Sequence, residues 1–244
     1  MLDTVSDRGR RPHPDALEEV KGQLLPDDGK QAESDNPHIA RDAHRCTTSK
    51  VKRTLDIVVS GAAIVVLSPL LALIALGLAA DRNGSIVFRQ ERSGLHGSVF
   101  CILKFRTMRP LQKGVPFAQT SGRDDERVTG LGKILRRTSL DELPQLWNVL
   151  KGDMSLVGPR PHPVELDRGL EDKDQRYPLR LLVKPGLTGL AQINNARGPI
   201  TDDKALDRRL TLDLAYIRDW SIGRDFKLLT NTLGYVFAAK RDAY

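Results

Sequence analysis

The sequence predicts an α+β protein in three parts: a polar N-terminal tail (1–49), an apolar membrane segment (50–82) and a small, mainly helical domain with a short β-hairpin (83–244). Three observations support this division. The first 48 residues lack any apolar period, an uncharged run of about 24 residues follows, and the remainder combines short β-rich runs with helical stripes of leucine. A chain of 244 residues has room for one medium domain or two small ones.

The chain is basic, with a formal net charge of +7. The first 48 residues carry 7 basic and 10 acidic side chains, so their charge of −3 leaves +10 for the rest. A basic domain favours anionic partners, which include nucleic acid, a membrane surface and a phosphorylated substrate. Two cysteines, Cys46 and Cys101, make no disulfide framework, and the five scattered histidines argue against a zinc site.

The tail is rich in proline, aspartate and glycine. Such a segment cannot bury enough apolar surface to offset the entropy of ordering it. We therefore predict that it is disordered through Thr48. It also lacks the apolar core of a signal peptide.

The apolar run Ile57–Ala80 is long enough to span a membrane as a straight helix of roughly 36 Å. A single-pass anchor is the simplest interpretation of its length. Two features favour a helix that enters and leaves by the same face. Lysine and arginine flank both ends of the run, and cationic flanks mark the cytoplasmic side. Ser68-Pro69 also lies near its middle, where proline removes a helical hydrogen bond and the serine hydroxyl can satisfy a freed group. Both topologies stay open at this point.

The domain begins with two β-rich runs, Ile86–Phe88 and Val99–Phe105, around a glycine-containing turn, which predicts a hairpin. Lys104 and Arg106 occupy positions on one face of the second strand. Such a pair can bind an anion, although a solvated strand face explains it equally simply.

Acidic and basic side chains are dense in the segment Ile134–Pro161. A capping box of Ser139 and Glu142 would explain the glutamate structurally, but it would put Pro144 at the fifth helical position. With Asp141 as the N-cap, the proline lies in the first turn, where its missing N–H is not needed. The Asp141 carboxylate then lies at a helix N-terminus, which also attracts phosphate. Simple capping remains an alternative role for this residue.

Three further residues are candidates for a binding site. Arg136 precedes the acidic pair, and Arg160 lies between two prolines that fix its backbone, which suits a guanidinium that meets phosphate oxygens. Asp213 falls on the apolar face of a predicted helix, where a carboxylate needs a partner. Arg209, four residues earlier, can supply one.

From about Lys50 to Tyr244 the chain resembles the bacterial sugar transferases, which are monotopic phosphoglycosyl transferases of exopolysaccharide and related glycan synthesis. The resemblance rests on motifs in family order: KRTLD, SP within the apolar run, VFRQERSG, LKFRTM, SLDELPQLWNVLKGDMSLVGPRP and KPGLTGLAQIN. One such motif would be weak, but the ordered series is specific.

The resemblance implies an anchor made of a re-entrant helix–break–helix hairpin, with the break at Ser68-Pro69, on the cytoplasmic face of the bacterial inner membrane. The resemblance implies that the protein transfers a sugar phosphate from a UDP-sugar to undecaprenyl phosphate and releases UMP. The expected sugar is a hexose such as glucose or galactose. The resemblance further implies Mg²⁺ as cofactor, the membrane bilayer as partner and no nucleic acid. A homo-oligomer is a further expectation.

The resemblance also assigns roles to residues. Asp141 is implied to be the nucleophile that attacks the β-phosphate and forms a covalent phosphosugar intermediate, and Glu142 its partner in the acid pair, with both carboxylates near the metal. The implied substrate-binding residues are Lys104, Arg106, Arg136, Arg160 and Asp213.

The sequence departs from the family at Leu190 and Asn195, where relatives often carry tryptophan and glycine. Asparagine tolerates the left-handed backbone that glycine would supply, so we expect the turn to persist. A competing hypothesis is a single-pass, membrane-tethered basic module that binds nucleic acid or anionic lipid. That hypothesis does not explain the adjacent Asp141 and Glu142, because acids at the centre of a phosphate-binding surface weaken binding.

Overall fold

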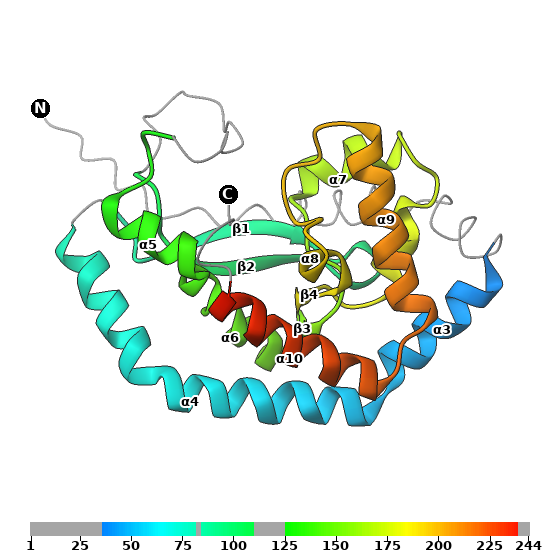
Figure 1. The fold of residues 1–244 in the computed structure, drawn as a ribbon, viewed down its shortest axis with the longest axis horizontal. Helices are drawn as coiled ribbons and strands as arrows, with labels where there is room; N and C mark the ends of the chain where they lie inside the picture. The colour runs from blue at the N-terminus through cyan, green and yellow to red at the C-terminus, as the bar shows by residue number, and fades with distance from the viewer. Residues whose placement is uncertain (1–35, 82–83, 110–124, 239–244) are drawn as a thin grey trace, which may run out of the picture.

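The computed structural model describes residues 36–81, 84–109 and 125–238. These residues form a domain of packed helices with two small sheets, and one long helix passes beneath it (Figure 1). In chain order, the elements are α3 (Pro37–Thr48), α4 (Lys50–Ala80), β1 (Val87–Ser93), η1 (Leu95–Gly97), β2 (Val99–Phe105), α5 (Gly130–Thr138), η2 (Leu140–Glu142), α6 (Gln145–Lys151), β3 (Ser155–Val157), α7 (Val164–Glu171), η3 (Tyr177–Leu182), β4 (Gly186–Thr188), α8 (Leu190–Ile193), α9 (Asp203–Arg218) and α10 (Ile222–Ala238). The predicted α+β class is confirmed.

The apolar segment forms α4, which bends as it passes under the domain (Figure 1). Pro69 lies inside this helix and cannot donate to the Val65 carbonyl, four residues earlier. The Ser68 hydroxyl donates to that carbonyl instead, at 2.8 Å, as its predicted role required. Interior prolines are a common cause of sharp helix bends. Where we expected two helices separated by a break, the structure has a single bent helix.

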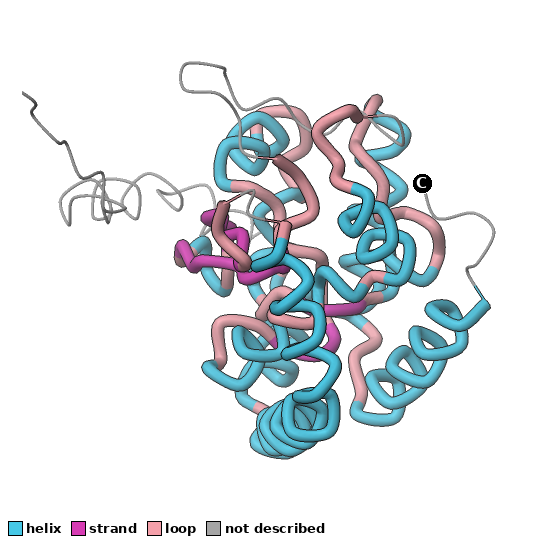
Figure 2. The backbone as a smooth tube through the Cα atoms, turned by 90° about the vertical axis from the view of Figure 1, so that its left-hand side faces the viewer, coloured by secondary structure: helices cyan, strands magenta, loops and turns pink. Residues whose placement is uncertain are grey.

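Both arms of α4 pack against the same domain. In the first arm, the Asp56 carboxylate accepts a hydrogen bond from the Leu156 N–H in β3, at 2.9 Å. In the second arm, Ile74 and Leu78 are buried in an apolar cluster with Phe105, the last residue of β2. The bend therefore lets one helix follow the curved underside of the domain. Figure 2 shows this helix roughly along its axis, at the bottom of the view.

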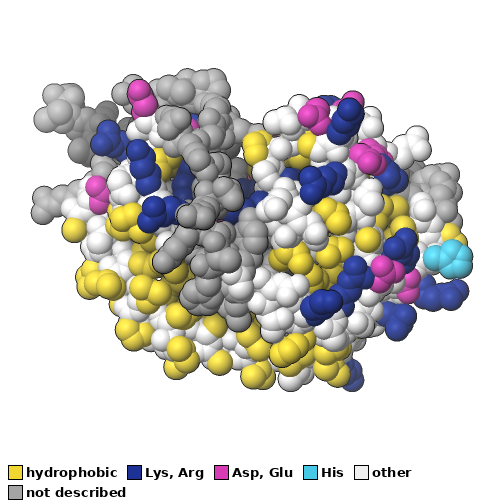
Figure 3. Space-filling view, in the orientation of Figure 1, with side chains coloured by type: hydrophobic (Ala, Val, Ile, Leu, Met, Phe, Trp, Pro, Cys, Tyr) yellow, Lys and Arg dark blue, Asp and Glu magenta, His cyan; other side chains and the backbone are white. Residues whose placement is uncertain are grey.

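The other face of α4 is apolar and exposed, and Figure 3 shows hydrophobic side chains along the lower edge of the molecule, where α4 runs. Within the described ranges, α4 is the one helix that is long and apolar enough to cross a membrane. Its exposed apolar residues include Val51, Leu55, Ile57, Val58, Val59, Val65, Val66, Leu73 and Leu76. The exposed side chains come from both arms, so the apolar surface continues along the whole helix.

The predicted hairpin is present as β1 and β2, which pair antiparallel with Phe88 opposite Lys104. The connecting turn places His96 and Gly97 at positive φ (52° and 71°), which reverses the chain in a few residues. Ile102 is buried in the main core and Phe105 in the cluster with Ile74 and Leu78, and Lys104 lies near the end of β2.

The second sheet is a parallel pair, β3 and β4, whose ends carry two of the family motifs. Backbone contacts between them are very close: a Cβ atom at Gly186 would lie 2.1 Å from the Gly158 nitrogen, so only glycine fits. The Gly158 N–H donates to the Thr188 carbonyl at 2.9 Å, and the Gly186 N–H donates to the Pro159 carbonyl at 2.8 Å. The loop that follows β3 is thereby fixed to both ends of β4.

The prediction of disorder through Thr48 is wrong for its last part, because Pro37–Thr48 forms α3. Ala43 and Cys46 are buried in the main core, and the Thr47 hydroxyl lies 3.2 Å from the Leu182 carbonyl. The composition of the whole tail concealed this short helix, whose few apolar side chains are ordered by packing on the domain. The rest of the predicted tail, residues 1–35, lies outside the described residues.

Candidate functional site

Asp141 and Glu142 lie at the junction of two helices. α5 ends at Thr138 and is followed by Ser139, whose backbone is left-handed (φ 57°). A single 3₁₀ turn, η2, then leads into α6. The Ser139 side chain makes no capping bond, so the capping box is wrong. Asp141 is not the N-cap of α6 either, because Pro144 occupies that position and places its missing N–H where a helix has no need of it.

Glu142 is held by two cations from other elements. The Lys104 ammonium, on β2, lies 2.8 Å from one carboxylate oxygen. The Arg160 guanidinium, on the loop after β3, donates to both oxygens, at 2.7 and 3.4 Å. Burial by itself would raise the pKa of Glu142, but Arg160 and Lys104 outweigh it and hold the pKa well below its usual value.

Asp141 is in the opposite situation. Its side chain is buried, and among the described residues no hydrogen bond reaches its carboxylate. Burial, followed by the charge of Glu142, raises the pKa of Asp141 to about 6, although Lys104, Arg136 and Arg160 oppose the rise. The carboxylate is therefore ionised at neutral pH, although no described residue donates a hydrogen bond to its oxygens.

Arg136 reaches the edge of this group from the last turn of α5. Its Nε donates to the Thr107 hydroxyl at 2.9 Å, and its charge lowers the pKa of Asp141. The structure thus brings together Asp141, Glu142, Lys104, Arg136 and Arg160 from three separate segments of the chain. Four of these five side chains are half-buried and one is buried, which strengthens their electrostatic interaction.

Arg106 does not join this group. β2 ends one residue earlier, and the Arg106 guanidinium turns to the end of α4, where it donates to the Leu78 carbonyl at 2.8 Å and lies 3.4 Å from Asp81. A cation at a helix C-terminus satisfies free carbonyls and interacts favourably with the helix dipole. The predicted pairing of Lys104 with Arg106 on one strand face is therefore not observed.

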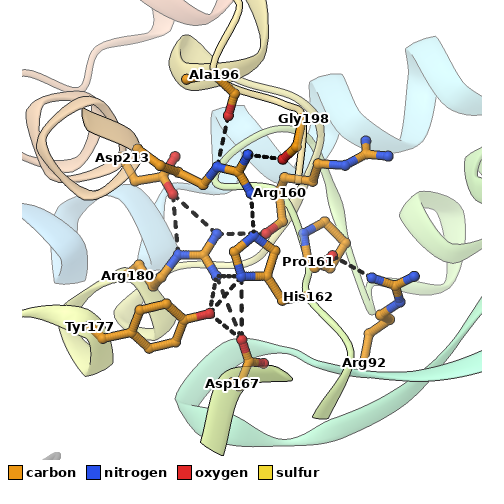
Figure 4. Close-up of polar contacts among 11 residues, drawn as sticks. Arg92, Arg160, Pro161, His162, Asp167, Tyr177, Arg180, Ala196, Gly198 and Asp213 are labelled. Atoms are coloured by element: carbon orange, nitrogen blue, oxygen red, sulfur yellow. Dashed lines mark hydrogen bonds and ion pairs between the residues drawn. The ribbon is translucent and has the colours of Figure 1, made fainter. Parts of the chain in front are cut away.

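Asp213 is fully buried in α9, and its partner is Arg180 rather than the expected Arg209. The Arg180 guanidinium lies 3.1 and 3.2 Å from one oxygen of Asp213 (Figure 4). Arg180 also donates to the backbone carbonyl of Arg160 at 2.6 Å. Asp213 therefore reaches the acidic pair only through Arg180 and the loop of Arg160.

Sequence reasoning missed the buried polar cluster around this ion pair, shown in Figure 4. Its other members are Arg92, His162, Asp167, Tyr177 and Arg209. The position of His162, directly after the Gly-Pro-Arg-Pro motif, was the one available signal. The remaining residues come from β1, α7, η3 and α9, and only the tertiary fold brings them together.

Few side chains at this site could coordinate a divalent metal ion. Within the described residues, no group of three or more His, Cys, Asp or Glu side chains could hold a metal ion. Mg²⁺ in phosphoryl-transfer sites is commonly held by one or two carboxylates together with substrate phosphates. Asp141 and Glu142 fit such a shared arrangement, and they do not fit an all-protein site.

The fold and the site thus combine a long helix with an exposed apolar face and a pair of carboxylates among cations, an arrangement that suits a phosphate ligand. Comparison with known proteins agrees: the family described as bacterial sugar transferase matches residues 47–239, and the chain belongs to this family. It is 45% identical over 182 residues to a UDP-glucose:undecaprenyl-phosphate glucose-1-phosphate transferase of Caulobacter vibrioides, covering 75% of this chain and 68% of that protein.

Other relatives are longer. The chain is 44% identical over 185 residues to an undecaprenyl-phosphate glucose phosphotransferase of Komagataeibacter xylinus, covering 75% of this chain and 35% of that protein. It is 38% identical over 197 residues to an undecaprenyl-phosphate galactose phosphotransferase of Salmonella typhimurium, covering 75% of this chain and 39% of that protein. The chain thus spans well under half the length of these two relatives.

Proposed function

We propose that this protein is an undecaprenyl-phosphate sugar phosphotransferase, which transfers a sugar 1-phosphate from a UDP-sugar to undecaprenyl phosphate and releases UMP. This reaction would be the first membrane step of exopolysaccharide or related glycan synthesis. Membership of the sugar transferase family and the names of the relatives support the proposal. The observation that carries it is the contrast between Glu142, which two cations hold, and Asp141, whose carboxylate is ionised and accepts no hydrogen bond from the described residues.

In the proposed reaction, an Asp141 oxygen attacks the β-phosphorus of the UDP-sugar. A bond forms between that oxygen and phosphorus, and the bond to the bridging oxygen breaks, so UMP departs with the electron pair. The sugar phosphate stays on Asp141 as an acyl phosphate. Undecaprenyl phosphate then attacks the same phosphorus and releases the carboxylate.

The cations reduce the repulsion between an anionic nucleophile and an anionic substrate. Lys104 and Arg160 are already positioned by Glu142, within reach of a phosphate that approaches Asp141. A guanidinium held in place before the substrate arrives needs little reorganisation during the reaction. Glu142 is therefore the residue that positions the phosphate-binding cations.

We propose Mg²⁺ as the cofactor, with Asp141 and Glu142 as its protein contacts. When bound, the ion would neutralise part of the charge on the diphosphate. The donor sugar is proposed to be a hexose, glucose or galactose, because the relatives are named for these two sugars.

We also propose that α4 is re-entrant and that the domain lies on the cytoplasmic face of the inner membrane. The proposal is supported by the packing of both arms of α4 against the same domain. The exposed apolar face of the bent helix supplies the surface for insertion. A single-pass tether with a basic binding domain would leave one arm free of the domain, and it receives no support from the relatives.

The function is tested by the release of UMP from purified protein given Mg²⁺, undecaprenyl phosphate and either UDP-glucose, UDP-galactose or UDP-N-acetylglucosamine. We expect release from one of the hexose donors, and none from Asp141→Asn. Asp219→Asn is the matched control, because it removes an exposed carboxylate that pairs with Arg218 and Arg224, away from the candidate site. Absence of UMP with every donor would refute the assignment.

A further inference from the structure

The loop that carries Arg160 is held by its backbone as well as by its side chain. Three consecutive carbonyl groups of this loop accept hydrogen bonds from outside it. These are Arg160 O from Arg180 Nη2 (2.6 Å), Pro161 O from Arg92 Nη1 (3.1 Å) and His162 O from Ser93 N (3.3 Å). Two of the three donors are arginine side chains, and Arg180 is the one that contacts Arg160 itself.

Arg180 is almost completely inaccessible to solvent, with 2% of its surface exposed. Asp213 lies 3.1 Å from Nη2, and the Tyr177 hydroxyl lies 3.2 Å from Nη1. Nη2 therefore points at once to the Asp213 carboxylate and to the Arg160 carbonyl. Asp213 compensates the buried charge and fixes the direction in which Arg180 donates.

His162 connects this ion pair to a second arginine. Burial and the charge of Arg180 lower the pKa of His162 to about 3, so the ring is neutral. Arg209 Nη1 lies 3.1 Å from Nε2 and Arg180 Nη1 lies 3.2 Å from Nδ1, so each ring nitrogen faces an arginine donor. Nδ1 also lies 2.6 Å from the Tyr177 hydroxyl, and that hydroxyl donates to Asp167.

The side chain of Arg160 extends away from this cluster, as Figure 4 shows, and its guanidinium binds Glu142. Thus the backbone of Arg160 belongs to the buried cluster while its guanidinium belongs to the reactive site. A buried ion pair contributes little net stability in comparison with apolar residues of similar volume. A directed hydrogen bond to the neighbouring carbonyl is something that apolar residues could not supply.

We propose that Arg180, oriented by Asp213, is a positioning residue that sets the place of the Arg160 guanidinium in the reactive site. Arg180 and Asp213 touch no substrate in this account and act through the Arg160 backbone. The effect on catalysis rests on the proposed function, whereas the effect on the loop does not. An error of about 1 Å in the position of a group that binds the reacting phosphate can lower the rate roughly 100-fold.

The first test is a double-mutant cycle on UMP formation, with Arg160→Ala, Arg180→Lys and the two combined. We expect Arg180→Lys to lower kcat about 10- to 100-fold and to change KM for the UDP-sugar less than about threefold. In the Arg160→Ala background the same change should cost less than about twofold, because residues that act through one another are not additive. Losses that multiply in the double variant would overturn the proposal.

A second variant guards against misfolding. Asp213→Asn keeps the shape of the side chain and removes the charge that orients Arg180, so its loss of activity should also vanish in the Arg160→Ala background. Arg176→Lys is the control: its arginine lies on the same stretch of chain, but it is exposed and pairs with Asp174 and Asp207. We expect full activity from this control.

The second readout does not depend on activity. Hydrogen exchange of the Arg160 and His162 amides, and of the Ser93 amide that donates to the His162 carbonyl, should become faster in Arg180→Lys and Asp213→Asn, while exchange in the rest of β1 and in β2 stays unchanged. Unchanged exchange in the loop would show that Arg180 does not hold it and would overturn the proposal. If the wild-type protein released no UMP, the proposed function would fail, and the exchange measurement would still decide the role of Arg180.

Discussion

Arg160 donates two hydrogen bonds to Glu142, at 2.7 and 3.4 Å, and no comparable bond from the described residues reaches the neighbouring Asp141. Two adjacent carboxylates thereby acquire different properties. The cations stabilise the charge of Glu142, whereas burial and the charge of Glu142 destabilise the charge of Asp141. Pairs of acids whose environments separate their pKa values are typical of active sites.

The first prediction is that Asp141→Asn abolishes turnover and stabilises the fold. The native pKa of Asp141 is about 6, against 3.8 for an ordinary aspartate, so its ionisation opposes folding by roughly 2–3 kcal/mol above pH 6. An uncharged asparagine removes this penalty. We expect a higher Tm for the variant at pH 7.5 and little difference near pH 3, which lies below both pKa values, so that the carboxyl group is mostly protonated in the native and the unfolded states. A large loss of stability at pH 7.5 would instead indicate that the carboxylate is a structural cap.

The second prediction concerns the pH dependence of the first chemical step. Attack requires the ionised carboxylate. The single-turnover rate of UMP release, measured without the lipid, should therefore fall about tenfold per pH unit below pH 6. Glu142 stays ionised over this range because its pKa is held low by Arg160 and Lys104. Arg160→Ala should shift the midpoint to higher pH, because it removes a cation that lowers the pKa of Asp141. A midpoint near pH 4 would contradict the observed burial.

The third prediction is that Arg160→Lys loses most activity although it keeps the charge. Lysine cannot donate to both oxygens of Glu142 or of a phosphate in the fork geometry of a guanidinium. We expect kcat/KM to fall at least about tenfold, corresponding to the loss of one charge-assisted hydrogen bond. Arg137→Lys is the comparison, because that arginine follows Arg136 but is absent from the charges that act on Asp141. Equal activity in the two lysine variants would remove Arg160 from the site.

The fourth prediction is that both ends of α4 lie on the same side of the membrane. Single cysteines at Lys50 and Asp81, in a protein with Cys46 and Cys101 replaced by serine, should both resist a membrane-impermeant thiol reagent in intact cells. Pro69→Leu restores a backbone donor and favours a straight helix, so it should detach the second arm from its cluster around Phe105. Labelling at one end only in the parent protein would establish a spanning helix.

The fifth prediction tests the docking of α3. Ala43 is 2% exposed in the core, so Ala43→Gln must bury a polar amide or displace the helix, and we expect a loss of roughly 2 kcal/mol in the free energy of unfolding. His44→Gln changes the adjacent exposed position and should change stability by less than about 0.5 kcal/mol. Urea unfolding of the two variants measures both values. Similar values would mean that α3 does not pack on the domain in solution.

Several features follow from the sequence because they depend on neighbours in the chain. Alternation of β-rich residues around a glycine turn is sufficient for the β1–β2 hairpin, and the stripe of Leu206, Leu210 and Ile217 is sufficient for α9. Pro69 removes a hydrogen-bond donor wherever it stands in a helix, so the bend in α4 is also local. The left-handed backbone of Asn195 (φ 58°) is also a local feature, which the sequence predicted.

The tertiary structure decided which charges meet. Lys104 and Arg106 are two residues apart, but the end of β2 sends one to Glu142 and the other to the end of α4. Asp213 has Arg209 one helical turn away, yet it pairs with Arg180 from another element. Side-chain partners of this kind depend on distances between segments that are far apart in the chain, and no local pattern encodes those distances. For the same reason, the sequence could single out the adjacent acids Asp141 and Glu142, and the family resemblance implied different roles for them, while only the packed fold showed which of the two carboxylates is held by cations.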